Sequence, residues 1–199
     1  KYRGAAPINW AIIRGERETG VTTFFLREAV DTGSIILQAR VPITPEETAG
    51  ELHDVLADVG AEIVLHTVRL IETGKATPHV QDDAQASPAP KIFKEDCRID
   101  WNKLPSELVN FIRGLSPRPC ASTLYRGSLL RVYRAASVET HGSKRPGEIL
   151  QADRRLLVQA AGGAVELLEV QQEGKKRMSA EEFLRGNRIA AGESLSGPK

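Results

Sequence analysis

The first part of the chain switches between helical and strand-like apolar patterns. Apolar residues at helical spacing follow Pro7, which suits the first turn of a helix, so a helix is predicted over residues 5–13. Residues 21–26 and 35–41 are rich in β-branched and aromatic side chains, which predicts two adjacent strands. The Asp31-Thr32-Gly33 string between them has the composition of a turn.

A longer amphipathic segment follows these strands. Thr48 is a suitable N-cap, and Gly74 a suitable stop, for a helix over residues 49–72. Most of its apolar side chains fall on one face, as expected for a helix that packs on a core. They are Leu52, Leu56, Val59, Ile63, Leu70 and Ile71.

The second half of the chain predicts short strands framed by two helices. Ser106 is the predicted N-cap of a helix that runs through Leu115, and Ser179 with Glu182 forms a capping box for the last helix. Turn residues separate the strand-like runs, and five or six short strands of this kind indicate a small Greek-key-like barrel. The runs cover 121–125, 129–138, 147–150, 156–160 and 165–171.

Net charge differs between the two halves, although the whole chain carries only +1. Residues 1–90 carry a net −5 and residues 91–199 a net +6. The boundary falls in the polar, proline-punctuated segment 82–90, which is typical of an extended linker. Such an asymmetry indicates a polyanionic partner for the basic half. The alternative is a basic surface that is merely solvated.

Composition is that of an ordinary globular protein. No apolar run approaches the roughly 20 residues that a membrane span needs, and we expect no signal peptide. We therefore expect a cytoplasmic protein without membrane contact. Cys97 and Cys120 have no CxxC spacing and no nearby histidine, so neither a disulfide nor a metal site is expected there. The chain opens at Lys1 without an initiator methionine, and we expect it to be part of a longer protein.

Residue spacing alone yields no complete active site. The four histidines are scattered without a metal-binding pair, and the chain has no P-loop, GxGxxG or nucleophile-elbow serine. Asp31 stands out by its position, because ligands of open α/β sheets gather where loops leave strand ends. Spacing alone leaves open that Asp31 only forms a turn.

Several longer strings match those of a known family. In the first half they are KYRGAAPI (1–8), ETGVTT (18–23), VDTGSII (30–36) and VPITPEETAG (41–50); in the second half they are APKI (89–92), RIDW (98–101), IRGLSPRP (112–119) and MSAEEFL (178–184). Arg-Gly-Ala-x-Pro and Asp-Thr-Gly occur across folate-dependent formyltransferases, whereas Ile-Asp-Trp followed by Pro-x-Pro is more specific. On these strings, the chain resembles the methionyl-tRNA formyltransferase family over almost its full length.

The resemblance implies an α/β plus β architecture. A remnant of a Rossmann-like formyltransferase domain would be followed by a small OB-like β-barrel domain. We expect the C-terminal part of the catalytic domain over residues 1–83, a linker over 84–96, a tRNA-binding domain over 97–191 and a disordered tail over 192–199.

The resemblance also implies a catalytic set of an Asn, a His two residues later, and an Asp, of which Asp31 is the match in this chain. The Asn-x-His motif normally lies immediately upstream of Lys1 and is absent, so the chain alone is expected to be inactive. The loop of Val30, Asp31, Thr32 and Gly33 would line the pterin side of the pocket for the formyl donor, 10-formyltetrahydrofolate. No metal is expected.

The implied reaction moves a formyl group from that folate to the α-amino group of methionyl initiator tRNA, for translation initiation. Attack of the amine builds a tetrahedral oxyanion, which the Asn amide and a protonated His would stabilise. Asp31 would favour and orient the imidazolium. Two alternatives stay open: a sister formyltransferase acting on a nucleotide sugar or a purine intermediate, and a non-catalytic tRNA-binding module.

The basic half offers candidate contacts to tRNA phosphates, which give salt-dependent affinity rather than sequence readout. We expect RNA binding at Lys91, Arg98, Arg113, Arg118, Lys175, Lys176 and Arg177, with Lys94, Arg126 and Arg131 as further candidates. Trp101 and Tyr125 are candidates for stacking on the single-stranded acceptor end. For Trp101 the alternative is packing of the barrel against the linker. With tRNA and folate as its partners, the protein is expected to be a monomer.

Overall fold

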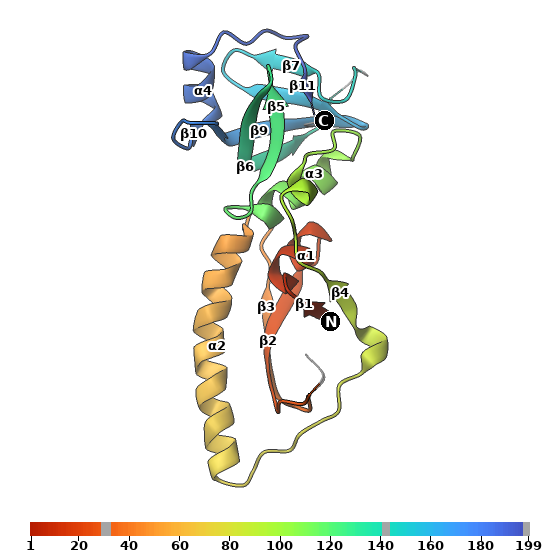
Figure 1. Cartoon of the computed structure of the whole chain (residues 1–199), viewed down its shortest axis with the longest axis vertical. Coiled ribbons are helices and arrows are strands. Elements are labelled where there is room, and N and C mark those ends of the chain that lie inside the picture. The colour runs from red at the N-terminus through yellow and green to blue at the C-terminus, as the bar shows by residue number, and fades with distance from the viewer. Residues whose placement is uncertain (29–32, 141–143, 197–199) are drawn as a thin grey trace. The chain divides into compact units, whose positions relative to one another are not determined.

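The computed structural model describes residues 1–28, 33–140 and 144–196, and it divides into two compact units. The first unit comprises Lys1–Ile12 and Glu16–Lys91. The second comprises Ile13–Gly15 and Ile92–Lys199. In Figure 1 the first unit runs from red to yellow-green, and the second from green to blue.

The first unit holds two small sheets and two helices (Figure 1). α1 covers Pro7–Ile13 and begins with the predicted proline. β2 and β3 pair antiparallel, which confirms the two predicted adjacent strands. β1 and β4, the first and last strands of the unit along the chain, pair in parallel. The strands are β1 (Tyr2–Gly4), β2 (Glu18–Phe24), β3 (Ile35–Pro42) and β4 (Ser87–Ala89).

α2 (Ala49–Glu72) has the predicted bounds and the predicted cap. The Thr48 hydroxyl accepts from the Glu51 amide, and the Glu51 carboxylate accepts from the Thr48 amide at 2.9 Å, which forms a capping box. The predicted apolar face is buried at Leu52 but not at Ile71, which is 44% exposed. The packed face of α2 therefore ends before its last turn.

Burial against the helices stabilises the small sheets of the first unit. A two-stranded sheet is marginally stable by itself in water, so β2 and β3 depend on the apolar cover that α1 and α2 provide. The buried residues of this cluster are Ala11, Ile12, Val41, Ile43, Ala49, Leu52 and Leu56.

Part of the segment predicted as a linker belongs to the first unit. Ser87–Ala89 forms β4, and the Ala89 carbonyl also accepts from the Ala6 amide at 3.1 Å. Short 3-10 helices cover Asp83–Gln85 and Glu95–Cys97. The backbone between them is therefore hydrogen-bonded rather than fully extended in solvent.

The second unit is built on one curled antiparallel sheet (Figure 1). The strand order is β11-β5-β6-β9-β8-β7, and β10 pairs with β9. The predicted tight turns are confirmed at Arg126-Gly127 and Gly162, all of which have positive φ. The strands are β5 (Ala121–Tyr125), β6 (Ser128–Val138), β7 (Ile149–Ala152), β8 (Leu156–Ala160), β9 (Gly163–Gln172), β10 (Met178–Ser179) and β11 (Leu195–Ser196).

Residues 193–196 link the two edges of this sheet. On one side β11 pairs with β5. On the other side the Ile149 amide donates to the Glu193 carbonyl at 2.7 Å, and the Leu195 amide donates to the Gly147 carbonyl at 2.8 Å. The curled sheet is thus bridged where its first and last strands approach each other.

The structure differs here from the predicted disordered tail over 192–199. Residues 192–196 are hydrogen-bonded, and Leu195 is 3% exposed. A single leucine among Gly, Ser and Glu carries no periodic signal, so its burial could not be predicted from the pattern. Residues 197–199 lie outside the described residues.

α3 (Pro105–Leu115) begins earlier than predicted, because its N-cap is Leu104 and not Ser106. Pro105 occupies the first helical position, where its missing N–H costs nothing. The Glu107 carboxylate accepts from the Leu104 amide at 2.9 Å and so satisfies the free backbone donor. No helix within the described ranges is both long and apolar enough to span a membrane.

α4 (Ala180–Gly186) begins at the predicted capping box of Ser179 with Glu182. Both α3 and α4 pack their apolar faces on the curled sheet. The two aromatic residues that were candidates for RNA stacking, Trp101 and Tyr125, lie in this core and are each only 4% exposed. Trp101 Nε1 donates to the Thr123 hydroxyl at 3.3 Å. The stacking prediction is therefore wrong for both rings.

Candidate active site and nucleic-acid face

The loop predicted to carry the catalytic aspartate connects β2 to β3. Val30, Asp31 and Thr32 lie outside the described residues, so their catalytic and folate-binding roles stay predictions. Gly33 is described and buried. A Cβ atom at Gly33 would lie 1.6 Å from the Phe25 carbonyl oxygen, so no larger residue fits there without moving the chain.

Hydrogen bonds fix the chain on both sides of that loop. The Phe25 amide donates to the Ser34 carbonyl at 3.0 Å. The Gln81 side-chain amide donates to the Gly33 carbonyl at 2.7 Å, and β3 exchanges two further backbone bonds of 2.8 Å with residue 79. The role of Gln81 could not be predicted from the sequence, because its partner is a backbone carbonyl 48 residues away.

Six of the seven residues predicted to bind RNA have exposed side chains. They are Lys91, Arg98, Arg118, Lys175, Lys176 and Arg177. Lys91 belongs to the first unit and the other five to the second. Exposure of these cations is compatible with phosphate contacts, whose energy comes from charge rather than from base readout.

Arg113 is placed differently from these six. Its side chain lies on the packed face of α3, only 7% of the residue is exposed, and its Nε donates to the Asn110 side-chain oxygen at 2.9 Å. Little of the guanidinium is left for a phosphate, so Arg113 is a weak candidate for RNA contact.

Arg177 is paired within the second unit. Its Nε and Nη2 each donate to the Glu169 carboxylate at 2.5 Å, and its guanidinium lies 4.2 Å from the centre of the Tyr133 ring. Arg134 also approaches Glu169, at 3.8 Å. The predicted basic run thus contains two exposed lysines and one arginine that already has a carboxylate partner.

A surface hollow of about 300 Å³ brings Arg98 close to a further candidate, Lys94. Two cations and two carboxylates share it, so its charge is nearly balanced. Its lining residues are Lys94, Glu95, Arg98, Ser122, Leu129 and Glu173. The hollow is too balanced in charge to serve as an anion site by itself.

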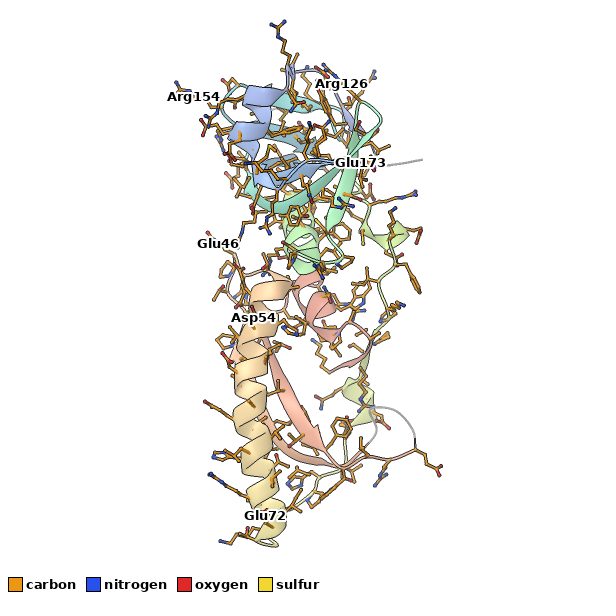
Figure 2. The ribbon with its side chains drawn as sticks, turned by 60° about the vertical axis from the view of Figure 1, so that its left-hand side comes forward. Glu46, Asp54, Glu72, Arg126, Arg154 and Glu173 are labelled. Atoms are coloured by element: carbon orange, nitrogen blue, oxygen red, sulfur yellow. The ribbon has the colours of Figure 1, made fainter. Side chains whose placement is uncertain are left out.

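Arg126, labelled in Figure 2, is engaged with the segment that bridges the sheet edges. Its Nε and Nη2 donate to the two carboxylate oxygens of Glu193, at 2.9 Å each. The Arg126 guanidinium, together with the Ala190 amide, lowers the pKa of Glu193 below its usual value. Arg126 therefore stabilises the fold of the second unit.

Both cysteines are free and buried. Burial raises the pKa of the Cys97 thiol, and likewise that of the Cys120 thiol, to about 11. Each thiol is therefore neutral at physiological pH. Within residues 1–28, 33–140 and 144–196, no group of three or more His, Cys, Asp or Glu side chains gathers in a metal-binding arrangement.

Comparison with known proteins identifies the family of both units. The family model for formyl transferases matches residues 1–68, and the model for the formyl transferase C-terminal domain matches residues 91–188. The chain belongs to the formyl transferase family. The resemblance inferred from the sequence motifs is thereby confirmed.

Curated relatives narrow the position of the chain within the formyl transferase family. It is 50% identical over 192 residues to a methionyl-tRNA formyltransferase of Chlorobium limicola, and 45% identical over 196 residues to one of Syntrophus aciditrophicus. These matches cover 94% and 98% of the chain but 60% and 63% of the relatives. The chain therefore spans about three fifths of the length of these relatives.

Solved structures of other proteins share the fold. HypX of Aquifex aeolicus, crystallised in complex with tetrahydrofolic acid, superposes with a TM-score of 0.69 at 23% identity, over 92% of this chain and 33% of that one. The sugar 3N-formyl transferase WlaRD gives a TM-score of 0.69 at 20% identity, over 88% of this chain and 62% of that one. These likenesses support the predicted Rossmann-like sheet–helix part, and they support a curled sheet in the second unit.

Proposed function

We propose that this formyl transferase moves a formyl group from 10-formyltetrahydrofolate to the α-amino group of methionyl initiator tRNA. The observation that carries the proposal is the 45–50% identity to methionyl-tRNA formyltransferases over nearly the whole chain. Ile-Asp-Trp and Pro-x-Pro, the strings most specific to the tRNA enzyme, lie in the second unit. The reaction belongs to translation initiation, which takes place in the cytoplasm.

In this proposal the first unit contributes Asp31 to catalysis. Attack of the methionyl amine on the formyl carbon creates a tetrahedral oxyanion, and each preorganised donor to that oxygen typically contributes about 3 kcal/mol. An Asn and a protonated His would be the donors, and Asp31 would keep the imidazole protonated and oriented. Asp31 would also hold a water that relays the proton leaving the amine.

None of the asparagines in these 199 residues is followed two positions later by a histidine. The two oxyanion donors would therefore come from a segment outside the chain, and the chain by itself is expected to transfer no formyl group. The activity belongs to the protein in which that segment and Asp31 meet.

The loop of Val30, Asp31, Thr32 and Gly33 would line the pterin side of the folate pocket. Support for folate as the donor comes from the shared fold with HypX, which was crystallised with tetrahydrofolic acid. At Gly33, the close approach of the Phe25 carbonyl and the bond from Gln81 would fix the exit of this loop. The reaction needs no metal, because the Asn and His supply the oxyanion donors.

The second unit would be an OB-like barrel that holds the tRNA backbone. The bridging of the two sheet edges by residues 193–196 supports a closed barrel. Exposed cations at Arg98, Arg118, Lys175 and Lys176 would contact phosphates, and Lys91 would add one from the first unit. The protein would act as a monomer, with one tRNA and one folate.

The test of the catalytic proposal is Asp31→Asn in a protein where the chain is preceded by a segment that carries the Asn-x-His motif. Transfer of labelled formyl to methionyl initiator tRNA should fall by about 10²-fold or more, because acid–base groups typically contribute that much. The matched control is Asp58→Asn, the same charge change at an exposed position of α2, which should leave the rate unchanged. An Asp31→Asn rate equal to that of the control would contradict the role of Asp31.

A sugar nucleotide is the second candidate acceptor. The observation in its favour is the shared fold with WlaRD, a sugar 3N-formyl transferase. At 20% identity this likeness concerns the fold alone, whereas the tRNA enzymes match at 45–50%. A non-catalytic tRNA-binding module is the third possibility, and transfer by the protein with the Asn-x-His segment in place would exclude it.

A further inference from the structure

The outer face of β6 and β9 carries a carboxylate that two arginines share. Arg177 Nε and Nη2 donate to separate oxygens of Glu169 at 2.5 Å, and Arg134 Nε lies 3.8 Å from Glu169. The exposed fractions of the side chains are 27% for Glu169, 37% for Arg134 and 39% for Arg177. This bidentate pair means that Glu169 occupies one edge of the Arg177 guanidinium.

The turn that follows β9 is fixed by the same cluster. The Tyr133 hydroxyl donates to the Gln171 side-chain oxygen at 2.6 Å, and the Gln171 amide donates to the Lys175 carbonyl at 2.8 Å. Arg177 covers the Tyr133 ring at 4.2 Å. Both ends of the turn from Gln171 to Arg177 are therefore tied to Tyr133. Glu173, labelled in Figure 2, lies within this turn.

Lys175 and Lys176 stand apart from this network. Both are exposed, and neither ammonium forms an ion pair with any residue that the structure describes. The basic run Lys175-Lys176-Arg177 thus divides into two unpaired lysines and one paired arginine. Sequence alone treats its three charges as equivalent.

We propose that Glu169 is a specificity-determining residue for RNA: it holds the Arg177 guanidinium in a bidentate pair and lies within ion-pair distance of Arg134, so that this face meets phosphates mainly through Lys175 and Lys176. The inference rests on the proposed RNA-binding role of the second unit. Phosphate contacts add affinity for every RNA, whatever its sequence. A fixed carboxylate cancels one of the two positive charges and repels a phosphate that approaches the pair, which limits binding of unrelated RNA.

The first test is Glu169→Gln in the 199-residue chain, with Kd measured against salt for initiator tRNA and for an unrelated RNA duplex. We expect tighter binding of both RNAs, a larger gain for the duplex, and a salt slope steeper by about 1 to 2, because each new phosphate contact adds about 0.9. The matched control is Glu166→Gln, also on β9, which removes the carboxylate partner of Arg155, the residue just before β8. Its salt slope should equal that of the wild type.

The second test is Arg177→Gln, alone and combined with Glu169→Gln. Alone it should change the affinity for tRNA less than twofold, since the pairing already removes Arg177 from RNA contact. In the Glu169→Gln background it should reverse the gain, a non-additivity that a purely structural role would not produce. Thermal unfolding of each variant checks that the second unit is still folded.

The remaining outcomes overturn the inference. If Glu169→Gln binds RNA no more tightly than the wild type, Glu169 does not restrain the arginines. If Glu166→Gln gains as much affinity as Glu169→Gln, the effect comes only from the change in net charge. A loss in Arg177→Gln alone as large as that in Lys176→Gln would place Arg177 on the RNA. If the wild-type chain binds neither RNA, the proposed RNA-binding role fails and takes this inference with it. If it binds RNA and only Glu169→Gln is without effect, the inference alone fails.

Discussion

Gly33 shows how a single contact in the structure explains a residue of a sequence motif. The Asp-Thr-Gly string predicts a turn, but only the structure gives the reason for the glycine, which is the Phe25 carbonyl oxygen 1.6 Å from where a Cβ would lie. Such contacts join residues that the sequence pattern does not relate. The same holds for Gln81, whose side chain bonds the Gly33 carbonyl.

Gly33→Ala should destabilise the first unit by about 1–3 kcal/mol, because overpacking forces the backbone to shift. Urea unfolding followed by helical circular dichroism measures this loss. Gly60→Ala is the control within α2, where nothing lies within 4 Å of the added Cβ. It should instead stabilise the chain by about 0.5–1 kcal/mol, the usual gain from alanine in a helix. Equal effects of the two changes would contradict the steric account.

The two cysteines should be unreactive in the folded chain. Burial holds the pKa of each thiol at about 11, so almost no thiolate, the reactive form, is present at pH 8. Iodoacetamide at pH 8 should label both Cys97 and Cys120 only after unfolding in urea, as read by mass spectrometry. Rapid labelling of either thiol in the native chain would contradict this placement.

For helices and strands, the caps and the apolar periodicity could be predicted from the sequence. The distant segments that each element packs against or pairs with could not. The bounds of α2 and the caps at Thr48 and Ser179 follow from local rules and are confirmed. Ser106 failed as a cap because Pro105 already fits the first helical position. β4 and β11 were missed, because two- or three-residue strands owe their pairing to distant partners rather than to a local pattern.

Loss of the α2 cap should have a measurable cost. Thr48→Ala removes the hydroxyl that accepts from the Glu51 amide and should lower the free energy of unfolding by about 1 kcal/mol. Thr73→Ala, at the other end of α2, removes a hydroxyl that donates to the Arg69 and Leu70 carbonyls and caps no backbone amide. It should cost less than half as much. Urea titrations of both variants decide the matter, and a larger effect at Thr73 would count against the capping box.

At the scale of the whole molecule, charge counts predicted a basic second half but not which cations are available. The structure pairs Arg126 with Glu193 and Arg177 with Glu169, and it buries Arg113. Pairing depends on which strands become neighbours, and net charge does not record it. Membership in the formyl transferase family was visible because its motifs are contiguous strings.

Acid should destabilise the second unit in particular. Five of its carboxyl groups have lowered pKa values: Asp100, Asp153, Glu166, Glu182 and Glu193. A lowered folded-state pKa contributes stability that is present above the unfolded value, about 3.9 for Asp and 4.3 for Glu, and is lost as pH falls through the folded value. The urea midpoint, followed by Trp101 fluorescence in a Trp10→Phe background, should fall steeply below about pH 4. Glu193→Gln should lessen that fall, and an unchanged pH profile would contradict the role of its pair with Arg126.

The central claim is that the acceptor is methionyl initiator tRNA. The direct measurement is transfer of labelled formyl from 10-formyltetrahydrofolate by the chain joined to an Asn-x-His segment, with methionyl initiator tRNA and a nucleotide-linked amino sugar offered together. We expect label on the tRNA and none above background on the sugar. Label on the sugar, or on neither acceptor while folate and tRNA still bind, would contradict it.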